Sequence, residues 1–548
     1  MFALAFFIGI YSYIIFCLSL LGLINKPAVF YTTLIYALFV LIYAWKFSGF
    51  YGHISKIKLP KNLKIGKVSQ NLYKNSKLKT ALVLLLILQA AVNLIGVFGP
   101  EISFDALWYH LTLPKIYIMM QRIVHIPGGL LYYSDMPKLT EMIYVPAIMF
   151  GGGLVAKFIH FGFGILTVIA IYKLSRKYFS KELSLVAALI FYSSLVVGWE
   201  SITAYIDLSR TFFELMAFWG FINWYESKKR KWLAISGIML GLAISSKILA
   251  LGSIFIFFIL FAYLFLVNKE KITDTLKNFF VFCFFSVLVP LPWFVFSFVH
   301  TGNPFYPFFD SRVSLGQTMA LPEPANFIRD VSGLFIFSSD PISPIFLIIL
   351  PVAAVLFFKS KEKIKIFYLY SLAALVLWYL TPKIGGGRFI LPYLPVFSIL
   401  SVYVLDVLKD KKIKTLLLFI TLLVAVSSIG YRFLANKKYI PYLLGRQTKA
   451  QFLTNNLNFS FGDFYDTDGY FKKTMKPSDT VLLYGFHNLY YADFNFIDSS
   501  WVKKGDGFDY IAVQNGNLPA RFSFWSLVYS NPVTKVKLYS LGGQQWLY

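Results

Sequence analysis

Apolar side chains dominate the chain in runs of about 20 residues, separated by short polar segments. Coiled as an α-helix, a run of that length crosses a hydrocarbon core of about 30 Å. The pattern therefore predicts a polytopic α-helical membrane protein with about 13 transmembrane helices. The runs that fit a span are 2–24, 28–45, 80–99, 154–173, 183–199, 205–225, 232–247, 249–267, 279–299, 344–358, 366–381, 389–407 and 415–435.

The first run, 2–24, is interpreted as a span that is retained and not as a signal peptide. No basic segment precedes it, and it is longer than a signal-peptide core.

The charge of the loops predicts the orientation of the spans. The segment 46–79 carries nine lysines and no acid. The connections at 176–177, 228–231, 269–271, 359–365 and 409–414 are also basic. All of them fall on the cytoplasmic side if the N-terminus is cytoplasmic, as the positive-inside rule requires. The loop 99–153 and the tail after the last run are then extracytoplasmic.

Composition agrees with a membrane protein and excludes two other classes. Hydrophobic residues make up 57% of the chain and charged residues 14%, whereas soluble domains are about a quarter charged. The net charge of +26 lies in loops between spans, so it does not indicate nucleic-acid binding. Cys17 and Cys283, the two cysteines, lie inside apolar runs, which gives no disulfide framework and no zinc motif.

The chain divides into three predicted parts. Residues 1–79 form two N-terminal helices and a basic cytoplasmic loop, and 80–435 form the main transmembrane module with its large first outer loop at 99–153. In the tail, 436–548, the segments TVLLYGF, DYIAVQN and VKLYSLGG are typical of short strands. The tail is long enough for a small extracytoplasmic α/β domain.

Ionisable residues at the membrane edge are costly, and each is therefore a candidate for function. The simpler interpretations are a solvated charge or helix cap for the loop acids, a snorkelling lysine for Lys247, and a hydrogen bond within the loop for His110. The candidates on the predicted outer side are Glu101, Asp105, His110, Lys115, Asp135, Lys138, Glu141, Asp207, Lys247 and Arg388.

Carboxylates and cations gathered at one interface suit the transfer of a group from a phosphate to a hydroxyl or an amine. A carboxylate takes the proton of the acceptor, while fixed Lys and Arg side chains stabilise charge on the departing phosphate. Glu101 and Asp105 are four residues apart and share one face if their segment is helical.

Four segments in this order resemble bacterial membrane glycosyltransferases of the GT-C superfamily. They are FDALWYHLTLPK at 104–115, YYSDMPKLTEMIY at 132–144, LPWFVFSFVHTGNPFYP at 291–307 and GGGRFILPYLP at 385–395. The likeness extends over about 80–407 and is to the branch with the protein mannosyltransferases, the lipid A aminoarabinose transferase and the rhizobial lipopolysaccharide glycosyltransferases. The two helices before residue 80 are additional to the usual start of that family.

The resemblance implies that a sugar moves from a polyprenyl-phosphate donor to a cell-envelope acceptor (lipid, polysaccharide or protein) at the outer face of the cell membrane, with inversion. It implies that Asp105 is the catalytic acid–base residue. The implied supporting or metal-binding acids are Asp207 and Glu101, and the implied donor-phosphate ligands are Lys138, Lys247 and Arg388. Candidate substrate contacts are His110, Trp108, Tyr109 and Tyr306.

In some relatives the two acids that match Asp105 and Asp207 help to hold a divalent metal, Mg or Mn. Some relatives also carry two adjacent acids in the first loop. Here Ala106 follows Asp105, so the sequence departs from that pattern. The WWD-type signature of oligosaccharyltransferases is absent, which argues against transfer of a whole glycan to asparagine.

Three other functions remain open at this stage. A transporter or lipid flippase would have charges along the bilayer midplane and repeated halves. A glycan polymerase or O-antigen-type ligase would have a large outer loop rich in Arg and His. A non-catalytic scaffold for the tail domain would not require a basic set among so many spans.

Overall fold

The structure is a computed structural model that describes residues 1–54, 76–268, 271–310, 323–336, 341–381 and 386–548. The remaining residues include part of the predicted cytoplasmic basic loops and the first glycine of GGGRFILPYLP. These features lie outside the described residues: Lys56, Lys58, Lys61, Lys64, Lys67, Lys74, Lys269 and Gly385.

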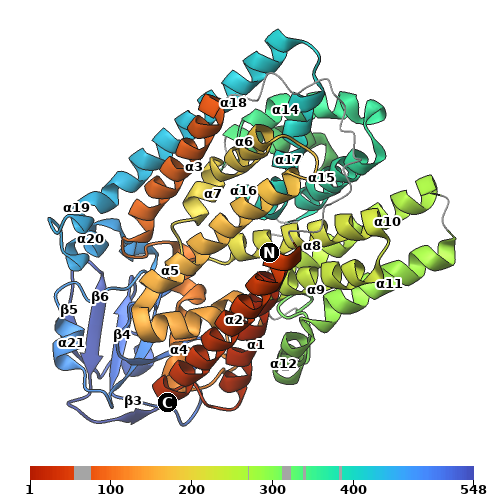
Figure 1. Cartoon of the computed structure of the whole chain (residues 1–548). Coiled ribbons are helices and arrows are strands. Elements are labelled where there is room, and N and C mark those ends of the chain that lie inside the picture. The colour runs from red at the N-terminus through yellow and green to blue at the C-terminus, as the bar shows by residue number, and fades with distance from the viewer. Residues whose placement is uncertain (55–75, 269–270, 311–322, 337–340, 382–385) are drawn as a thin grey trace.

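Each of the thirteen predicted runs contains helix, which confirms a polytopic helical architecture (Figure 1). The helices of the runs are α1 (Phe2–Leu20), α2 (Lys26–Ile54), α3 (Ser76–Val97), α5 (Leu139–Ser175), α6 (Lys181–Tyr192), α7 (Leu195–Glu200), α8 (Asp207–Ser227), α9 (Arg230–Ser246), α10 (Ser253–Asn268), α11 (Ile272–Leu288), α12 (Leu291–Thr301), α14 (Ile345–Leu356), α15 (Glu362–Leu380), α16 (Gly387–Ile390), α17 (Leu394–Val407) and α18 (Lys411–Asn436). Another helix, α13 (Phe327–Ile336), lies outside the runs.

The number of spans is smaller when length and hydropathy are both required. Within the described ranges, eight helices are long and apolar enough to cross a membrane, or nine if α11 and α12, bent by 57°, form one span. Helices α6 and α14 have 12 residues each, and α8 carries charged residues among its apolar ones. The multi-pass class is therefore established, while the count of thirteen stays a prediction.

Helix α5 begins fifteen residues before its predicted run, because the glycine triplet 151–153 bends it without ending it. Its 37 residues continue through Gly152, which has φ 68° and ψ −167°. That backbone conformation strains any residue with a Cβ, so the glycine turns the helix axis at this point. The predicted outer loop 99–153 thus contains the first part of α5 as well as the short helix α4 (Thr112–Met120).

Helix α8 lies at the centre of the bundle, and most of its residues are buried. Helix α9 packs closely against α8 because Gly220 has no side chain. A Cβ at Gly220 would lie only 3.0 Å from the Ser236 Cα. At the edge of the bundle, α3 and α18 lie side by side although far apart in sequence (Figure 1). The Asn436 side chain closes this pair by donating to the Val92 carbonyl at 2.8 Å.

The tail folds into a strand-containing domain, as predicted. Its five-stranded sheet has the order β2-β1-β4-β6-β5. Strands β2, β1 and β4 are parallel to one another, and β6 pairs antiparallel with both β4 and β5. The predicted strand segments contain β1, β4 and β6. The strands are β1 (Thr480–Tyr484), β2 (Asn495–Asp498), β4 (Tyr510–Gln514), β5 (Ser526–Ser530) and β6 (Val536–Ser540), with a separate pair β3 (Gly507–Phe508) and β7 (Trp546–Leu547); the helices are α19 (Ile440–Leu443), α20 (Lys449–Asn456) and α21 (Tyr470–Thr474).

The C-terminal domain contacts α4 and the segment before it, at one end of the helical bundle (Figure 1). The Lys115 ammonium donates to the carbonyls of Tyr490 and Ala492 and to the Asp493 carboxylate, each at 2.8 Å. The Tyr491 hydroxyl donates to the Glu101 carbonyl at 2.8 Å. The domain therefore has a fixed position next to the first loop.

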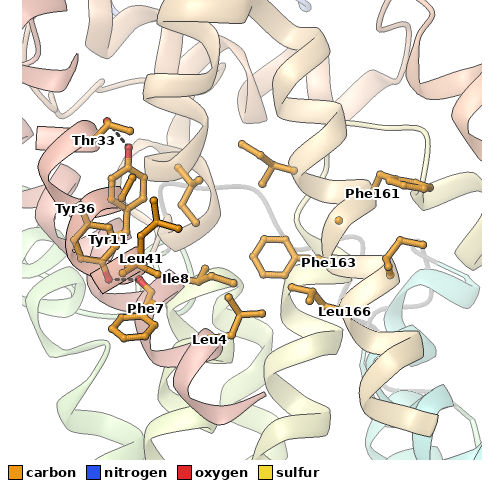
Figure 2. A pocket seen from close by; sticks show the side chains of 16 residues that line it. Leu4, Phe7, Ile8, Tyr11, Thr33, Tyr36, Leu41, Phe161, Phe163 and Leu166 are labelled. Atoms are coloured by element: carbon orange, nitrogen blue, oxygen red, sulfur yellow. Dashed lines mark hydrogen bonds between the residues drawn. The ribbon is translucent and has the colours of Figure 1, made fainter. Parts of the chain in front are cut away.

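A pocket of about 900 Å³ lies between α1, α2 and α5 (Figure 2). Its lining is almost wholly apolar, and its hydroxyl groups are engaged: Tyr11 bonds to Thr33 at 2.7 Å and Tyr36 donates to the Phe7 carbonyl at 2.7 Å. The side chains around this pocket include no carboxylate, lysine or arginine. It therefore lacks the groups that group transfer requires, and these groups gather elsewhere.

Candidate active site

Asp105 stands directly before a single π-helical turn, η1 (Ala106–His110). Such a turn holds one residue more than an α-helical turn and changes the direction of the side chains around it. The backbone N–H of Asp105 donates to the Tyr205 hydroxyl at 3.1 Å, which ties the turn to the segment before α8. The Asp105 side chain is 17% exposed.

Arg388 is the centre of a group of five charged residues, which we call the charged cluster. Its members are Asp105, Glu200, Asp207, Lys247 and Arg388. Arg388 Nη2 lies 2.8 Å from Asp105 Oδ2, and Arg388 Nε lies 3.4 Å from Glu200 Oε1 and 3.6 Å from Asp207 Oδ2. The Lys247 ammonium lies 2.6 Å from Asp207 Oδ1. Four residues that the sequence singled out on four separate segments are therefore linked by a continuous chain of ion-pair contacts.

Asp207 is the first residue of α8, where the helix dipole favours a negative charge. His160 of α5 orders the segment that precedes this helix. Its Nε2 accepts the Leu208 backbone N–H at 3.0 Å, and its Nδ1 lies 2.9 Å from the carbonyls of Glu200 and Thr203. An imidazole with this bonding carries its proton on Nδ1, so it connects both ends of the 200–208 segment.

The two cations come from breaks in helices. Lys247 follows the last residue of α9 and has extended backbone before the 3-10 turn η3 (Ile248–Gly252). Arg388 is the second residue of α16, directly after the turn at Gly386, which has φ 49°. Each of these side chains contacts a buried acid, Asp207. Both are also 13% exposed, so part of each cation stays accessible.

Glu200 is a member of the charged cluster that the sequence analysis missed. Its side chain is fully buried at the end of α7, in the segment VVGWES. A carboxylate at the end of an apolar run is the signal that could have identified it, since such burial demands a partner.

Aromatic rings surround the charged cluster and reduce its contact with water. The Arg388 guanidinium lies 4.7 Å above the Tyr205 ring. Tyr109 and Tyr133 stack with centroids 3.8 Å apart at 11°, and the Trp108 indole N–H donates to the Leu130 carbonyl at 2.8 Å. In such a setting charged groups interact more strongly than they do in water.

The other predicted site residues have other contacts in this structure. Glu101 accepts the backbone N–H groups of Ile102, Ser103 and Ala204 at 2.7–2.9 Å, and so fixes the start of the first loop. Buried His110 lies 2.9 Å from Glu141.

Lys138 and Tyr306 both donate to backbone carbonyls close to them in sequence. The fully buried Lys138 ammonium donates to the carbonyls of Tyr133 and Met136. Burial lowers the pKa of Lys138 to about 8. Tyr306 lies in the turn after α12, where its N–H donates to the Asn303 carbonyl at 3.3 Å.

The carboxylates of the charged cluster do not fit a divalent metal. In the described part of the chain, no group of three or more His, Cys, Asp and Glu side chains is arranged to hold a metal ion. Asp105 and Asp207 instead direct oxygens at Arg388 and Lys247. A metal needs those oxygens as ligands, and the two cations already supply the positive charge.

We therefore expect chelation to leave the activity of the protein unchanged within about twofold. The measurement is the transfer rate of purified protein after treatment with excess EDTA and removal of the chelator–metal complex. A loss that Mg²⁺ or Mn²⁺ restores would contradict this expectation.

The chain is similar to known glycosyltransferases in sequence and in fold. The sequence model of the dolichyl-phosphate-mannose-protein mannosyltransferase family matches residues 144–295. No curated protein sequence matches the chain. The structure of ArnT from Cupriavidus metallidurans bound to undecaprenyl phosphate is 12% identical, with a TM-score of 0.56 over 84% of this chain and 98% of ArnT.

Two further structures resemble the chain. ArnT from the same organism in the apo state has 12% identity and a TM-score of 0.57, over 85% of this chain and 98% of that chain. The archaeal oligosaccharyltransferase AglB from Archaeoglobus fulgidus has 14% identity and a TM-score of 0.48, over 80% and 70% of the two chains. The fold is thus that of ArnT, and the resemblance to GT-C glycosyltransferases is confirmed.

Proposed function

We propose that this chain is a membrane glycosyltransferase. It moves a sugar from a polyprenyl-phosphate donor to a cell-envelope acceptor on the extracytoplasmic side, with inversion at the anomeric carbon. One observation carries the proposal: Arg388 joins Asp105 to Asp207, and Asp207 holds Lys247. A proton acceptor and two phosphate-binding cations are thereby brought into one cluster.

The reaction is a single displacement. The acceptor hydroxyl gives its proton to the Asp105 carboxylate as its oxygen bonds to the anomeric carbon of the donor. The bond between that carbon and the phosphate oxygen breaks, and its electron pair leaves with the polyprenyl phosphate. Arg388 and Lys247 stabilise the charge that grows on the phosphate. Attack opposite to the leaving group inverts the configuration of the sugar.

The ion pair between Arg388 and Asp105 gives the binding of substrates an order. An oxygen of Asp105 that accepts from Arg388 Nη2 at 2.8 Å is not directed at an acceptor hydroxyl. The donor phosphate competes for the same guanidinium, since Arg pairs with phosphate through two parallel hydrogen bonds. Donor binding therefore frees Asp105 Oδ2 to face the acceptor hydroxyl.

Lys138 remains a proposed ligand of the donor phosphate, and its pKa gives a test. Below about pH 8 its side chain is an ammonium, and above that pH it is the neutral amine. We expect the KM for the donor to rise about tenfold between pH 7 and pH 9, because the cation that attracts the phosphate is lost. Lys138→Arg, which keeps its charge over this range, serves as the control and is expected to show a flatter profile.

The direct test compares cell envelopes. Glycolipids, polysaccharides and glycoproteins are analysed by mass spectrometry from cells that lack the gene and from cells complemented with the wild-type or Asp105→Asn chain. The wild-type chain is expected to add the mass of one sugar residue to one acceptor class, and the variant is not. Equal envelopes in all three strains, together with changed movement of a lipid across the membrane, would support the transporter alternative instead.

A further inference from the structure

A group of four rings beside Asp105, which we call the aromatic wall, is built jointly by the first loop and the C-terminal domain. The loop supplies Phe104 and Trp108, and the domain supplies Phe461 and His487. The His487 ring lies 4.8 Å from Phe104, 4.3 Å from Trp108 and 5.5 Å from Phe461, and Phe104 lies 5.1 Å from Phe461. Asp105 follows Phe104 directly, so the wall stands next to the proposed base.

The rings of the aromatic wall are partly accessible. Phe461 is 58% exposed, and Phe104, Trp108 and His487 are each partly exposed. A single exposed Phe needs no explanation. Four adjoining rings beside a carboxylate are the composition of a ligand site, in which apolar faces supply contact area and a few polar groups fix the orientation.

The C-terminal domain fixes the hydrogen-bonding state of His487. The Asn488 amide N–H donates to the buried Asp463 carboxylate, so the Asn488 carbonyl oxygen faces away from that acid. That oxygen lies 3.2 Å from His487 Nδ1, which therefore carries the proton and leaves Nε2 as an acceptor. Burial lowers the pKa of His487, against the opposing effects of Asn488, Asp463 and Asp105, and keeps the imidazole neutral at pH 7.

We propose that the aromatic wall is the acceptor subsite and that the acceptor presents a sugar ring there. The ring stacks its C–H face on Phe461, with the edge of Phe104 beside it at an interplanar angle of 74°, donates one hydroxyl to His487 Nε2 and directs another at Asp105. This inference rests on the proposed function, and it leaves the proposed single-displacement reaction at the anomeric carbon unchanged. His487 acts as a positioning residue, because it orients the acceptor and does not touch the reacting bond.

The contacts of the wall favour a sugar over a phosphorylated headgroup. The described contacts of the four rings are with aromatic, amide and backbone groups, and two carboxylates, Asp105 and Asp463, act on His487. A phosphate would require cations at this position. A neutral sugar ring with several hydroxyls fits this position, because His487 Nε2 can accept a hydrogen bond from one hydroxyl while the apolar ring faces contact the C–H groups.

Binding can be tested on the full-length protein in detergent without knowing the acceptor. The probes are a panel of methyl glycosides and, for comparison, a Ser- and Thr-containing pentapeptide, all followed by saturation-transfer NMR, with inorganic phosphate added as an unlabelled competitor. We expect saturation of the ring protons of at least one glycoside. His487→Ala and Phe461→Ala are expected to reduce it at least about fivefold, and His487→Gln, which retains an acceptor, to restore part of it.

Phe524→Ala is the matched control, since Phe524 is an exposed ring of the same domain, 51% exposed and in contact with Trp546. It is expected to bind glycosides like the wild type, and the melting temperature shows whether each variant is folded. Saturation of the pentapeptide alone, absence of saturation by every glycoside, or equal loss in Phe524→Ala would overturn the inference.

Failure of this inference is distinguishable from failure of the proposed function. Consumption of a polyprenyl-phosphate-sugar donor by the wild-type protein, without glycoside binding at the wall, overturns the acceptor subsite alone. Glycoside binding at the wall, with no consumption of any polyprenyl-phosphate-sugar donor supplied to the protein, overturns the transferase reaction.

Discussion

Asp105→Asn is expected to lower kcat for sugar transfer by at least about 10³-fold, the range that a positioned general base supplies. The amide has nearly the same shape as the carboxylate and cannot take the acceptor proton. It also replaces the ion pair with Arg388 at 2.8 Å by a contact with a neutral amide oxygen. The measurement is the single-turnover rate at saturating donor, because this rate reports the chemical step and not product release.

Asp274→Asn is the matched control for this substitution. Asp274 is an exposed acid in the first turn of α11, and its loss is expected to change the rate less than twofold. A folded Asp105→Asn protein that transfers sugar at near the wild-type rate would remove Asp105 from its proposed role and leave Glu200 and Asp207 as the acids to test.

Arg388→Lys is expected to reduce kcat/KM for the donor by about 10²- to 10³-fold, although the charge is conserved. The guanidinium contacts Asp105 through Nη2 and both Glu200 and Asp207 through Nε. An ammonium is a single point charge and cannot reproduce this fork or its two-pronged bond to a phosphate. The measurement is the steady-state rate as a function of donor concentration, with product quantified by chromatography.

Arg521→Lys, at an arginine of the C-terminal domain that lies over the Tyr548 ring at 4.3 Å, is the comparison variant and is expected to retain the wild-type rate. Replacing Arg388 by a neutral residue is a poorer test, because buried carboxylates without their cation cost about 3–5 kcal/mol of stability. If Arg388→Lys kept the wild-type kcat/KM, the guanidinium would not be a ligand of the donor phosphate.

The sequence predicted much of the fold and most of the charged cluster, and the reason is physical. In a chain of apolar runs an ionisable residue is rare, and Asp105, Asp207, Lys247 and Arg388 each stood out for that reason. The strands β1, β4 and β6 of the tail were also predictable, because each is a short segment rich in β-branched and aromatic residues between turn residues. Local patterns of this kind do not depend on distant parts of the chain.

Three features that depend on the folded conformation of the backbone were not predicted. Glu200 joins the charged cluster because His160 and the 200–208 segment hold it next to Arg388. The carbonyl contacts of Lys138 require the η2 turn (Tyr132–Asp135) to fold back toward its ammonium. Helix α5 continues through Gly152, although three successive glycines indicated the end of a loop.

The proposed acceptor subsite shows the same limit. His487 is about 380 residues from Trp108 in sequence and 4.3 Å from it in space. Nothing local in the segment YGFHNLY distinguishes it from any other exposed loop. The docking of the domain through Lys115 creates the neighbourhood, and a docking surface leaves no periodic pattern in one sequence.

The balance of charge around Arg388 has a consequence for selectivity in the cell. The five members of the charged cluster comprise three acids and two bases, so a small anion arriving from water gains little by entering. A phosphate carried on an isoprenoid chain is confined to the bilayer beside the site, and this tethering raises its effective concentration far above that of any dissolved competitor. Under the proposed function, the chain therefore selects its donor by where that donor resides.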